Sequence, residues 1–183
     1  MDYLIRKLNQ TDMDAIMRLF NDAFRHDHIY EDHQFNIQND GALFRTAIEH
    51  AVLRGHSLGA FLDSTLVSFL LGFDYHTGMV QYPHAMADIF CLDETGQSAY
   101  HELTPFFQEA RKHPNLYYIM SLATRQEFRN QGLAGKLIDV LIAHTNKDII
   151  SDTSSAISTT LCRHRGFRIT QLGEDYHLAV LSR

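Results

Sequence analysis

Residues 129–136 carry the clearest chemistry in this sequence. They read Arg-Asn-Gln-Gly-Leu-Ala-Gly-Lys and lie between an apolar run, Leu116 to Thr124, and a stretch whose apolar residues recur at helical spacing from Leu133 onward. This pattern predicts a buried strand, a polar turn and a helix. The first amides of a helix have no intrahelical acceptor, and the aligned peptide dipoles give them positive character. We therefore expect this turn to bind a phosphate or a pyrophosphate.

The side chains of the turn suit an anion. Gly132 lets the backbone approach a ligand without a Cβ in between. Arg129 has a guanidinium that can fork onto phosphate oxygens, and Lys136 adds a point charge. Lys136 lies in the first helical turn, where a cation opposes the helix dipole, so a bound anion would relieve a conflict. The segment is neither a P-loop nor a dinucleotide fingerprint. By its spacing alone, a purely structural turn remains the alternative.

The elements around this turn predict a mixed α/β domain spanning residues 1–183, without internal repeats or a linker. A capping box at Thr11 and Asp14 is expected to start the first helix, and Gly166 to close the last. Residues 74–96 are expected to be irregular. Strands are predicted at 3–8, 58–62, 66–73, 116–124, 148–152, 167–172 and 176–181, and helices at about 13–24, 42–55, 98–112, from 133, and 155–165.

Composition excludes several classes of function. The net charge of -6 and pI near 6.0 argue against nucleic acid as a partner, because phosphate backbones require a clustered basic surface. The same charge is compatible with an amine substrate. No signal peptide is visible, and no apolar run reaches the roughly 18 residues of a membrane helix. Cys91 and Cys162 are far apart, which indicates a reducing compartment. We expect a cytoplasmic protein that has no membrane partner.

The sequence contains 12 histidines, and several of them cluster. The first group lies between the first two predicted helices, and a transition-metal site, an acceptor-binding loop and a solvated polar loop are all open there. Metal binding requires convergent imidazoles with supporting partners, which proximity in sequence does not establish, and we expect no metal. The clusters comprise His26, Asp27, His28, Glu31, Asp32 and His33, and then His76, His84, Asp88, Asp93 and Glu94.

The order of the predicted elements resembles that of the GNAT-type N-acetyltransferases over nearly the full length. Two motifs are specific: residues 129–134 are similar to that family's Arg/Gln-x-x-Gly-x-Gly/Ala, and Arg165-Gly166-Phe167 is similar to the Gly-Phe that ends its next helix. The resemblance implies the acyl-CoA N-acyltransferase fold. That fold is a mixed, mostly antiparallel sheet with a splay between the central strands and helices on both faces.

The resemblance also implies a donor substrate, acetyl-coenzyme A, and an amine acceptor. The acceptor is open: a small molecule, a peptide N-terminus or a protein lysine. The turn would bind the pyrophosphate, and the strand before it would pair with the pantetheine and polarise the thioester. The implied coenzyme-binding residues are Leu122, Ala123, Thr124, Arg129, Asn130, Gln131, Gly132, Leu133, Ala134, Gly135, Lys136 and Ser155.

The reaction that the resemblance implies is direct attack of the amine on the thioester through a tetrahedral intermediate. Here the chain departs from the family, because Cys162 stands where a tyrosine commonly protonates the leaving thiolate. Cys162 is therefore the catalytic candidate, with a small buried packing residue as the alternative. Water or one of the tyrosines at 117, 118 and 176 are further candidates for the acid. For the base, Glu127, Ser121 and Tyr118 are all open.

The sequence is also compatible with three other hypotheses. The missing tyrosine makes a non-catalytic coenzyme A-binding sensor or scaffold a credible alternative. The same fold also serves binding modules that hold no coenzyme A, and a wider splay would admit longer acyl chains. Terminal strands of this kind often pair across a dimer, so a homodimer is possible.

Overall fold

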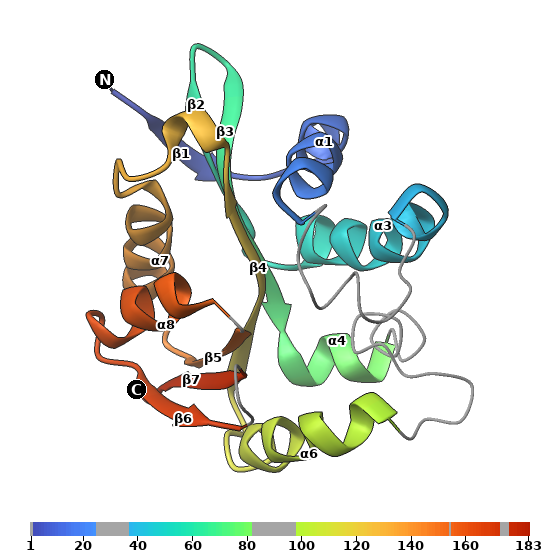
Figure 1. The fold of residues 1–183 in the computed structure, drawn as a ribbon, viewed down its shortest axis with the longest axis vertical. Helices are drawn as coiled ribbons and strands as arrows, with labels where there is room; N and C mark the ends of the chain where they lie inside the picture. The colour runs from blue at the N-terminus through green and yellow to red at the C-terminus, as the bar shows by residue number, and fades with distance from the viewer. Residues whose placement is uncertain (1, 25–36, 82–97, 154, 173–175) are drawn as a thin grey trace. The chain divides into compact units, whose positions relative to one another are not determined.

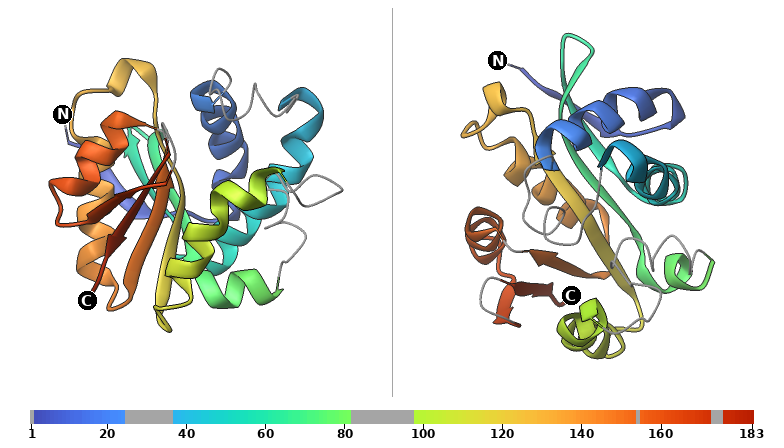
Figure 2. Two further views of the ribbon diagram at one scale, coloured as in Figure 1. Left: turned by 60° about the horizontal axis from the view of Figure 1, so that its bottom comes forward. Right: turned by 45° about the vertical axis from the view of Figure 1, so that its right-hand side comes forward.

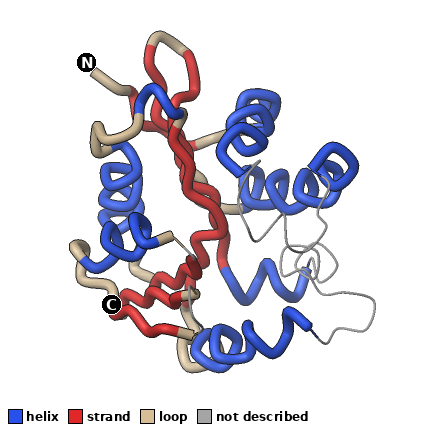
Figure 3. The backbone as a smooth tube through the Cα atoms, viewed as in Figure 1, coloured by secondary structure: helices blue, strands red, loops and turns tan. Residues whose placement is uncertain are grey.

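A seven-stranded sheet organises the computed structural model, which describes residues 2–24, 37–81, 98–153, 155–172 and 176–183 (Figures 1 and 3). The strand order is β1-β2-β3-β4-β5-β7-β6. In the described register β4 pairs with β5 in parallel, whereas β1–β2, β2–β3, β5–β7 and β6–β7 are antiparallel. The predicted mixed sheet is confirmed. Its strands are β1 (Leu4–Lys7), β2 (Leu58–Leu62), β3 (Thr65–Asp74), β4 (Leu116–Thr124), β5 (Asp148–Thr153), β6 (Arg168–Gln171) and β7 (His177–Leu181).

The first of two compact units comprises Met1–Phe73 and Ser121–Ala143. Helices α1 (Met13–Phe24) and α3 (Ile37–Arg54) cover one face of its strands, and α7 (Leu133–His144) covers the other (Figure 2). Burial explains this arrangement, because each helix directs an apolar stripe at the sheet. In α7 this stripe consists of Leu133, Leu137, Ile138 and Leu141, each at most 2% exposed.

The second unit comprises Asp74–Met120 and His144–Arg183. Helices α4 (Tyr75–Gln81) and α6 (Ser98–Ala110) lie on one face of its strands, and α8 (Ala156–Arg163) packs on the other against β6 and β7 (Figure 2). The ring of Phe106 on α6 contacts Tyr75 at 5.9 Å and Tyr118 at 5.3 Å between centroids, both edge-to-face. These aromatic contacts fix α4 and the start of β4 on the same core.

The structure corrects the predicted start of the first helix. Its capping box consists of Asn9 and Asp12, not Thr11 and Asp14, and it opens a 3-10 turn (Gln10–Asp12) that continues into α1. Arg6 of β1 decides this position, because it donates to both carboxylate oxygens of Asp12 at 2.8 Å. The hydrogen bond from Arg6 lowers the pKa of Asp12. A contact from a neighbouring strand thus selected one of two similar local patterns.

Three further boundaries differ from the prediction. Helix α3 begins at Ile37, earlier than the predicted residue 42. Helix α4 occupies part of the segment predicted as irregular; Asp74 accepts the amide of Thr77 at 3.3 Å, and Tyr75 is buried. Helix α8 ends at Arg163, and His164 is its cap residue. Gly166, with φ +83°, therefore lies two positions after the cap, whereas the prediction placed it one position after the cap. The clusters at residues 26–33 and 84–94, with Cys91, lie outside the described residues.

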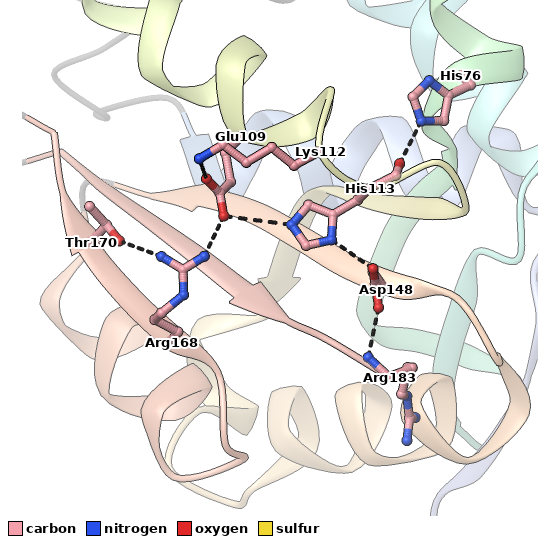
Figure 4. Close-up of polar contacts among 8 residues, drawn as sticks. All are labelled: His76, Glu109, Lys112, His113, Asp148, Arg168, Thr170 and Arg183. Carbon is pink, nitrogen blue, oxygen red and sulfur yellow. Dashed lines mark hydrogen bonds and ion pairs between the residues drawn. The ribbon is translucent and has the colours of Figure 1, made fainter.

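A histidine between two carboxylates joins the elements of the second unit (Figure 4). His113 Nδ1 lies 2.6 Å from Asp148 Oδ2, and its Nε2 lies 3.6 Å from Glu109 Oε1. Glu109 also accepts from Lys112 at 2.7 Å and from Arg168 of β6. These bonds, chiefly that from Lys112, lower the pKa of Glu109 to about 2. The contacts link α6 to β5 and β6.

No helix in the described ranges is long and apolar enough to cross a membrane.

The Glu109 contacts predict an acid-sensitive contribution to stability. The folded pKa lies below the ordinary value of 4.5, so the contribution is complete above about pH 4.5 and is lost as the pH falls towards 2. The shift corresponds to about 3 kcal/mol. We expect Glu109→Gln to lower the free energy of unfolding by that order at pH 7, and by much less at pH 3. Urea unfolding at both pH values measures this. An equal loss at both would contradict it.

Candidate active site

The turn between β4 and α7 has an open backbone conformation. After a 3-10 turn (Gln126–Phe128), Asn130 and Gly132 both have positive φ, +61° and +74°. The carbonyl of Gly132 accepts the amide of Lys136 at 3.0 Å, so Gly132 is the cap residue of α7. A glycine has no side chain to accept from the first amides of the helix. A Cβ placed on Gly132 meets no described atom within 4 Å. The predicted anion cradle therefore has a helix start with open space above its glycine.

Hydrogen bonds from the turn's own side chains hold it in place. Arg129 Nε donates to the carbonyl of Thr124 at 3.2 Å, and Gln131 donates to the carbonyl of Glu127 at 3.4 Å. The hydroxyl of Tyr3 donates to Gln131 Oε1 at 2.5 Å, which attaches the turn to the start of β1. Arg129, Asn130, Gln131 and Lys136 are exposed. Gln131 thus holds the turn against Tyr3 and the carbonyl of Glu127. The side chains of Arg129 and Lys136 place two positive charges beside the predicted anion cradle.

A buried serine fixes the end of β4, where the pantetheine is predicted to lie. Ser68 Oγ donates to the carbonyl of Ala123 at 2.8 Å and lies 2.8 Å from Thr124 Oγ1. Arg125 continues this attachment: its amide and its Nε donate to the carbonyls of Val67 and Leu66, both at 2.9 Å. Sequence reasoning missed Ser68. The sequence feature that could have indicated Ser68 is a polar residue within an otherwise apolar strand.

The pairing of β4 with β5 covers the first part of both strands. The described register runs from Leu116 opposite Asp148 to Ile119 opposite Ser151. Beyond that point β4 continues to Thr124, while Asp152 and Thr153 of β5 pair with β7. This is the splay of the central strands that the fold prediction included.

A carboxylate with two tyrosines lies where this pairing ends. Tyr118 of β4 donates its hydroxyl to Asp152 Oδ1 at 2.7 Å, and Tyr176, which precedes β7, donates to Oδ2. Burial raises the pKa of Asp152, and the two phenol hydrogen bonds oppose that shift. Sequence reasoning weighed Tyr118 and Tyr176 but missed Asp152. The sequence feature that could have indicated Asp152 is an acidic residue near the end of a partly apolar strand.

Comparison with solved structures establishes the fold, whereas no protein-family model and no curated protein matches the sequence. A Drosophila melanogaster polyamine N-acetyltransferase aligns over 100% of both chains with a TM-score of 0.73 and 14% identity. An agmatine N-acetyltransferase aligns over 99% of both, with a TM-score of 0.75 and 13% identity. The Thermoplasma acidophilum PaiA N-acetyltransferase, solved with coenzyme A, aligns over 100% of both chains with a TM-score of 0.66 and 12% identity.

This chain has the GNAT-type N-acetyltransferase fold. The resemblance seen in the sequence is thereby confirmed at the level of the fold. The first unit contains the residues of the predicted GNAT coenzyme site from Leu122 to Lys136, at the end of β4 and the start of α7. The second unit contains Ser155, Cys162 and Asp152. Their roles in binding and catalysis remain predictions.

Two residues of α8 have local roles in this fold. Ser155 caps the helix, since its side chain accepts the amide of Ser158 at 3.3 Å. Cys162 is 5% exposed, and burial raises the pKa of its thiol to about 11, with Arg165 acting in the opposite direction. Protonation of a thiolate with a pKa near 8.5 by such a thiol would be uphill by roughly 3 kcal/mol. This favours the packing alternative for Cys162.

The other candidates for proton transfer are more solvated. Glu127 is exposed, and Ser121 is half-buried on β4. Within the described ranges no group of three or more histidine, cysteine, aspartate or glutamate side chains could hold a metal ion.

The buried thiol predicts slow alkylation of Cys162. At pH 8 a thiol with a pKa of about 11 is ionised about 200-fold less than an unperturbed one, and burial blocks access as well. We expect iodoacetamide to modify the Cys162 peptide at least 200-fold more slowly in the folded protein than in a denatured sample, as followed by mass spectrometry. Equal rates would show that the thiol is exposed and reactive.

Proposed function

We propose that this protein is an N-acetyltransferase that transfers the acetyl group of acetyl-coenzyme A to an amine. The observation that carries the proposal is the start of α7. There the helix begins at a positive-φ glycine that follows β4 and a 3-10 turn, and a Cβ built on this glycine meets no described atom within 4 Å, in a chain with the GNAT fold. A helix start of this kind suits a pyrophosphate because its amides and its dipole both favour negative charge.

The residues present fit the donor substrate. The amides of Leu133, Ala134 and Gly135 would donate to the pyrophosphate, and Arg129 and Lys136 would neutralise its charge. The backbone of residues 122–124 would pair with the pantetheine, since β4 continues here beyond its described pairing with β5. A tightly attached strand end suits this role, because Ser68 and Arg125 hold it in one position.

The proposed reaction is direct acyl transfer. A neutral amine attacks the thioester carbonyl, the new C–N bond forms, and a backbone amide of β4 stabilises the oxyanion. The C–S bond then breaks and the coenzyme A thiolate leaves. The positively charged nitrogen loses one proton, which the thiolate or water takes up, so that a neutral amide and coenzyme A remain. With a pKa near 8.5 that thiolate is a good leaving group without a strong acid. Positioning of the two reactants supplies much of the rate.

We infer a small-molecule amine as the acceptor. Two of the similar structures are a polyamine and an agmatine N-acetyltransferase. The net charge of -6 agrees with a cationic substrate. Peptide and protein amines are alternative outcomes of an acceptor screen.

Two glycines allow a matched test of the coenzyme site. Gly132 and Gly166 both have positive φ, +74° and +83°. Among the described atoms, an added Cβ has no contact within 4 Å at Gly132 and one contact, at 3.8 Å, at Gly166. Alanine at either position should therefore cost about 1 kcal/mol of backbone strain. Only Gly132→Ala puts a methyl group into the cradle. We expect it to weaken coenzyme A binding at least tenfold by calorimetry, while Gly166→Ala binds as the wild type does.

Equal affinities of the two alanine variants for coenzyme A would contradict the proposal that the turn at Gly132 binds its pyrophosphate. Wild-type protein without affinity for coenzyme A would overturn the proposed function and favour a coenzyme-free binding module. If it binds, acetyl-coenzyme A at 100 times its dissociation constant should add about 2.7 kcal/mol of stability.

Turnover separates an enzyme from a sensor. We expect release of free coenzyme A thiol from acetyl-coenzyme A with at least one member of a panel of primary amines, including 1,4-diaminobutane and agmatine. Binding of acetyl-coenzyme A without release on any acceptor would instead support the sensor or scaffold. Butyryl-coenzyme A in the same assay tests whether a longer acyl chain is accepted.

A further inference from the structure

Ser68 is a polar side chain within the apolar core of the first unit. It lies on β3, is fully buried and donates its hydroxyl to the carbonyl of Ala123 at 2.8 Å. The Oγ1 atom of Thr124 lies 2.8 Å from Ser68 Oγ. A serine hydroxyl has only one hydrogen, so Thr124 is the donor in this second bond. A chain of two hydroxyls therefore ends on the carbonyl of the Ala123–Thr124 peptide.

The direction of this carbonyl fixes the direction of the amide in the same peptide. The described residues contain no cis peptide bond, and a planar trans peptide points its C=O and its N–H to opposite sides. The Ala123 carbonyl points to Ser68 of β3, so the N–H of Thr124 points away from β3. The next peptide has the reverse direction, because the amide of Arg125 donates to the carbonyl of Val67 on β3. Thr124 thus presents both its N–H and its carbonyl at the edge of β4 that faces away from β3.

Of these two groups, the carbonyl already has a partner. It accepts Arg129 Nε at 3.2 Å. A carbonyl beside a developing oxyanion would repel it, and a guanidinium on that carbonyl offsets the repulsion. In the described register the last strand pair along this edge of β4 is at Ile119, and the side chains are half-buried from Met120 to Leu122 and again at Thr124. The N–H of Thr124 is therefore offered at an edge where the structure describes no strand pair.

We propose that Ser68 is a positioning residue for acetyl transfer, because it aims and polarises the N–H of Thr124, which donates to the thioester oxygen of acetyl-coenzyme A; this rests on the proposed function. Hydrogen bonds in a chain strengthen one another, so a donor on the Ala123 carbonyl makes the N–H of the same peptide a better donor. Ser68 itself does not touch the substrate. It acts through the backbone of β4.

The amide acts at the step where charge develops. As the amine nitrogen forms the C–N bond, the π electrons of the thioester C=O move to its oxygen, and the N–H of Thr124 stabilises the negative charge. The electrons return to the C=O bond as the C–S bond breaks, and the sulfur leaves with the electrons of that bond. The nitrogen gives one proton to the thiolate or to water.

Every protein group in this proposal belongs to the first unit. Ser68 comes from β3, the polarised amide from the end of β4, and the predicted pyrophosphate cradle from the turn before α7. Arg129 joins the strand end to the cradle, since it lies in the turn and its Nε holds the Thr124 carbonyl. The residues that bind the two ends of the donor substrate are thus fixed to each other by hydrogen bonds.

The test is Ser68→Ala, with Ser57→Ala as its matched control. Ser57 is also fully buried in the first unit, and its hydroxyl donates at 2.8 Å to a carbonyl, that of Ala51 on α3. Each variant deletes one buried hydroxyl, and we expect both to be less stable in urea than the wild type. Only Ser68→Ala should lower kcat for thiol release from acetyl-coenzyme A with 1,4-diaminobutane, by about tenfold. Its KM for acetyl-coenzyme A should stay unchanged, because the affected bond strengthens in the transition state.

A spectroscopic measurement reports the hydrogen bond directly and requires no acceptor. A donor on a thioester oxygen lowers the stretching frequency of the C=O bond, and an isotopic label on the thioester carbonyl carbon isolates this band in difference infrared spectra. We expect bound acetyl-coenzyme A to absorb at lower wavenumber in the wild type and in Ser57→Ala than in Ser68→Ala. Ser68→Cys keeps a weaker donor in the same place and should lie between them. If Ser68→Ala does not fold, Ser68→Cys is compared with the wild type.

The outcomes separate this inference from the proposed function. Wild-type kcat and an unshifted carbonyl band in Ser68→Ala would overturn the role of Ser68 and leave the acetyltransferase proposal standing. An equal loss of kcat in Ser68→Ala and Ser57→Ala would show a structural role and would overturn it as well. If the wild type binds acetyl-coenzyme A without turnover, the infrared comparison decides. If the wild type does not bind coenzyme A in calorimetry, the proposed function fails and this inference fails with it.

Discussion

The different neighbours of β4 and β5 are the constraint on which the rest of this structure depends. The two strands pair from Leu116 to Ile119 and from Asp148 to Ser151. Beyond these residues no β4–β5 pair is described, whereas the pairing of β5 with β7, which begins at Ile149, continues to Thr153. Ser68 and Arg125 attach the end of β4 to β3, and the ladder with His177 and Leu178 attaches the end of β5 to β7. Backbone groups at a strand end that leaves its neighbour need other partners. A substrate with amide groups, such as pantetheine, is one solution.

The two elements that follow these strands differ in how they begin. Helix α7 begins at Gly132, which supplies no side-chain cap, whereas α8 begins at Ser155, whose side chain accepts from Ser158. A helix start without a side-chain cap suits an external anion, whereas the start of α8 has an acceptor in its own cap residue. This contrast explains why the anion-binding chemistry is assigned to α7, although both helices follow strands of the same sheet.

Local patterns predicted most of the fold because they depend on neighbours in sequence. The positive-φ turn at Asp63 and Ser64 between β2 and β3, the strand before residue 129 and the helix from Leu133 all follow from turn chemistry and apolar periodicity. The errors arose where a distant group decided the outcome. Arg6 selected Asp12 as the capping acid, and the packing of Tyr75 on Phe106 supported a helix in a segment with weak helical signals. Such contacts have no signature in a single sequence.

The sequence by itself determined that a polar glycine turn stands between a buried strand and a helix, because glycine, arginine and helical periodicity act within a few residues; that this turn binds an anion stays a prediction. It also placed a cysteine where the family has a tyrosine. Only the tertiary structure decided that this cysteine is a buried, weakly acidic thiol, and that Asp152 gathers two tyrosines separated from it by 34 and 24 residues. The reason is physical: a pKa depends on desolvation and on charges nearby in space, and sheet register, not spacing in the chain, brings those groups together.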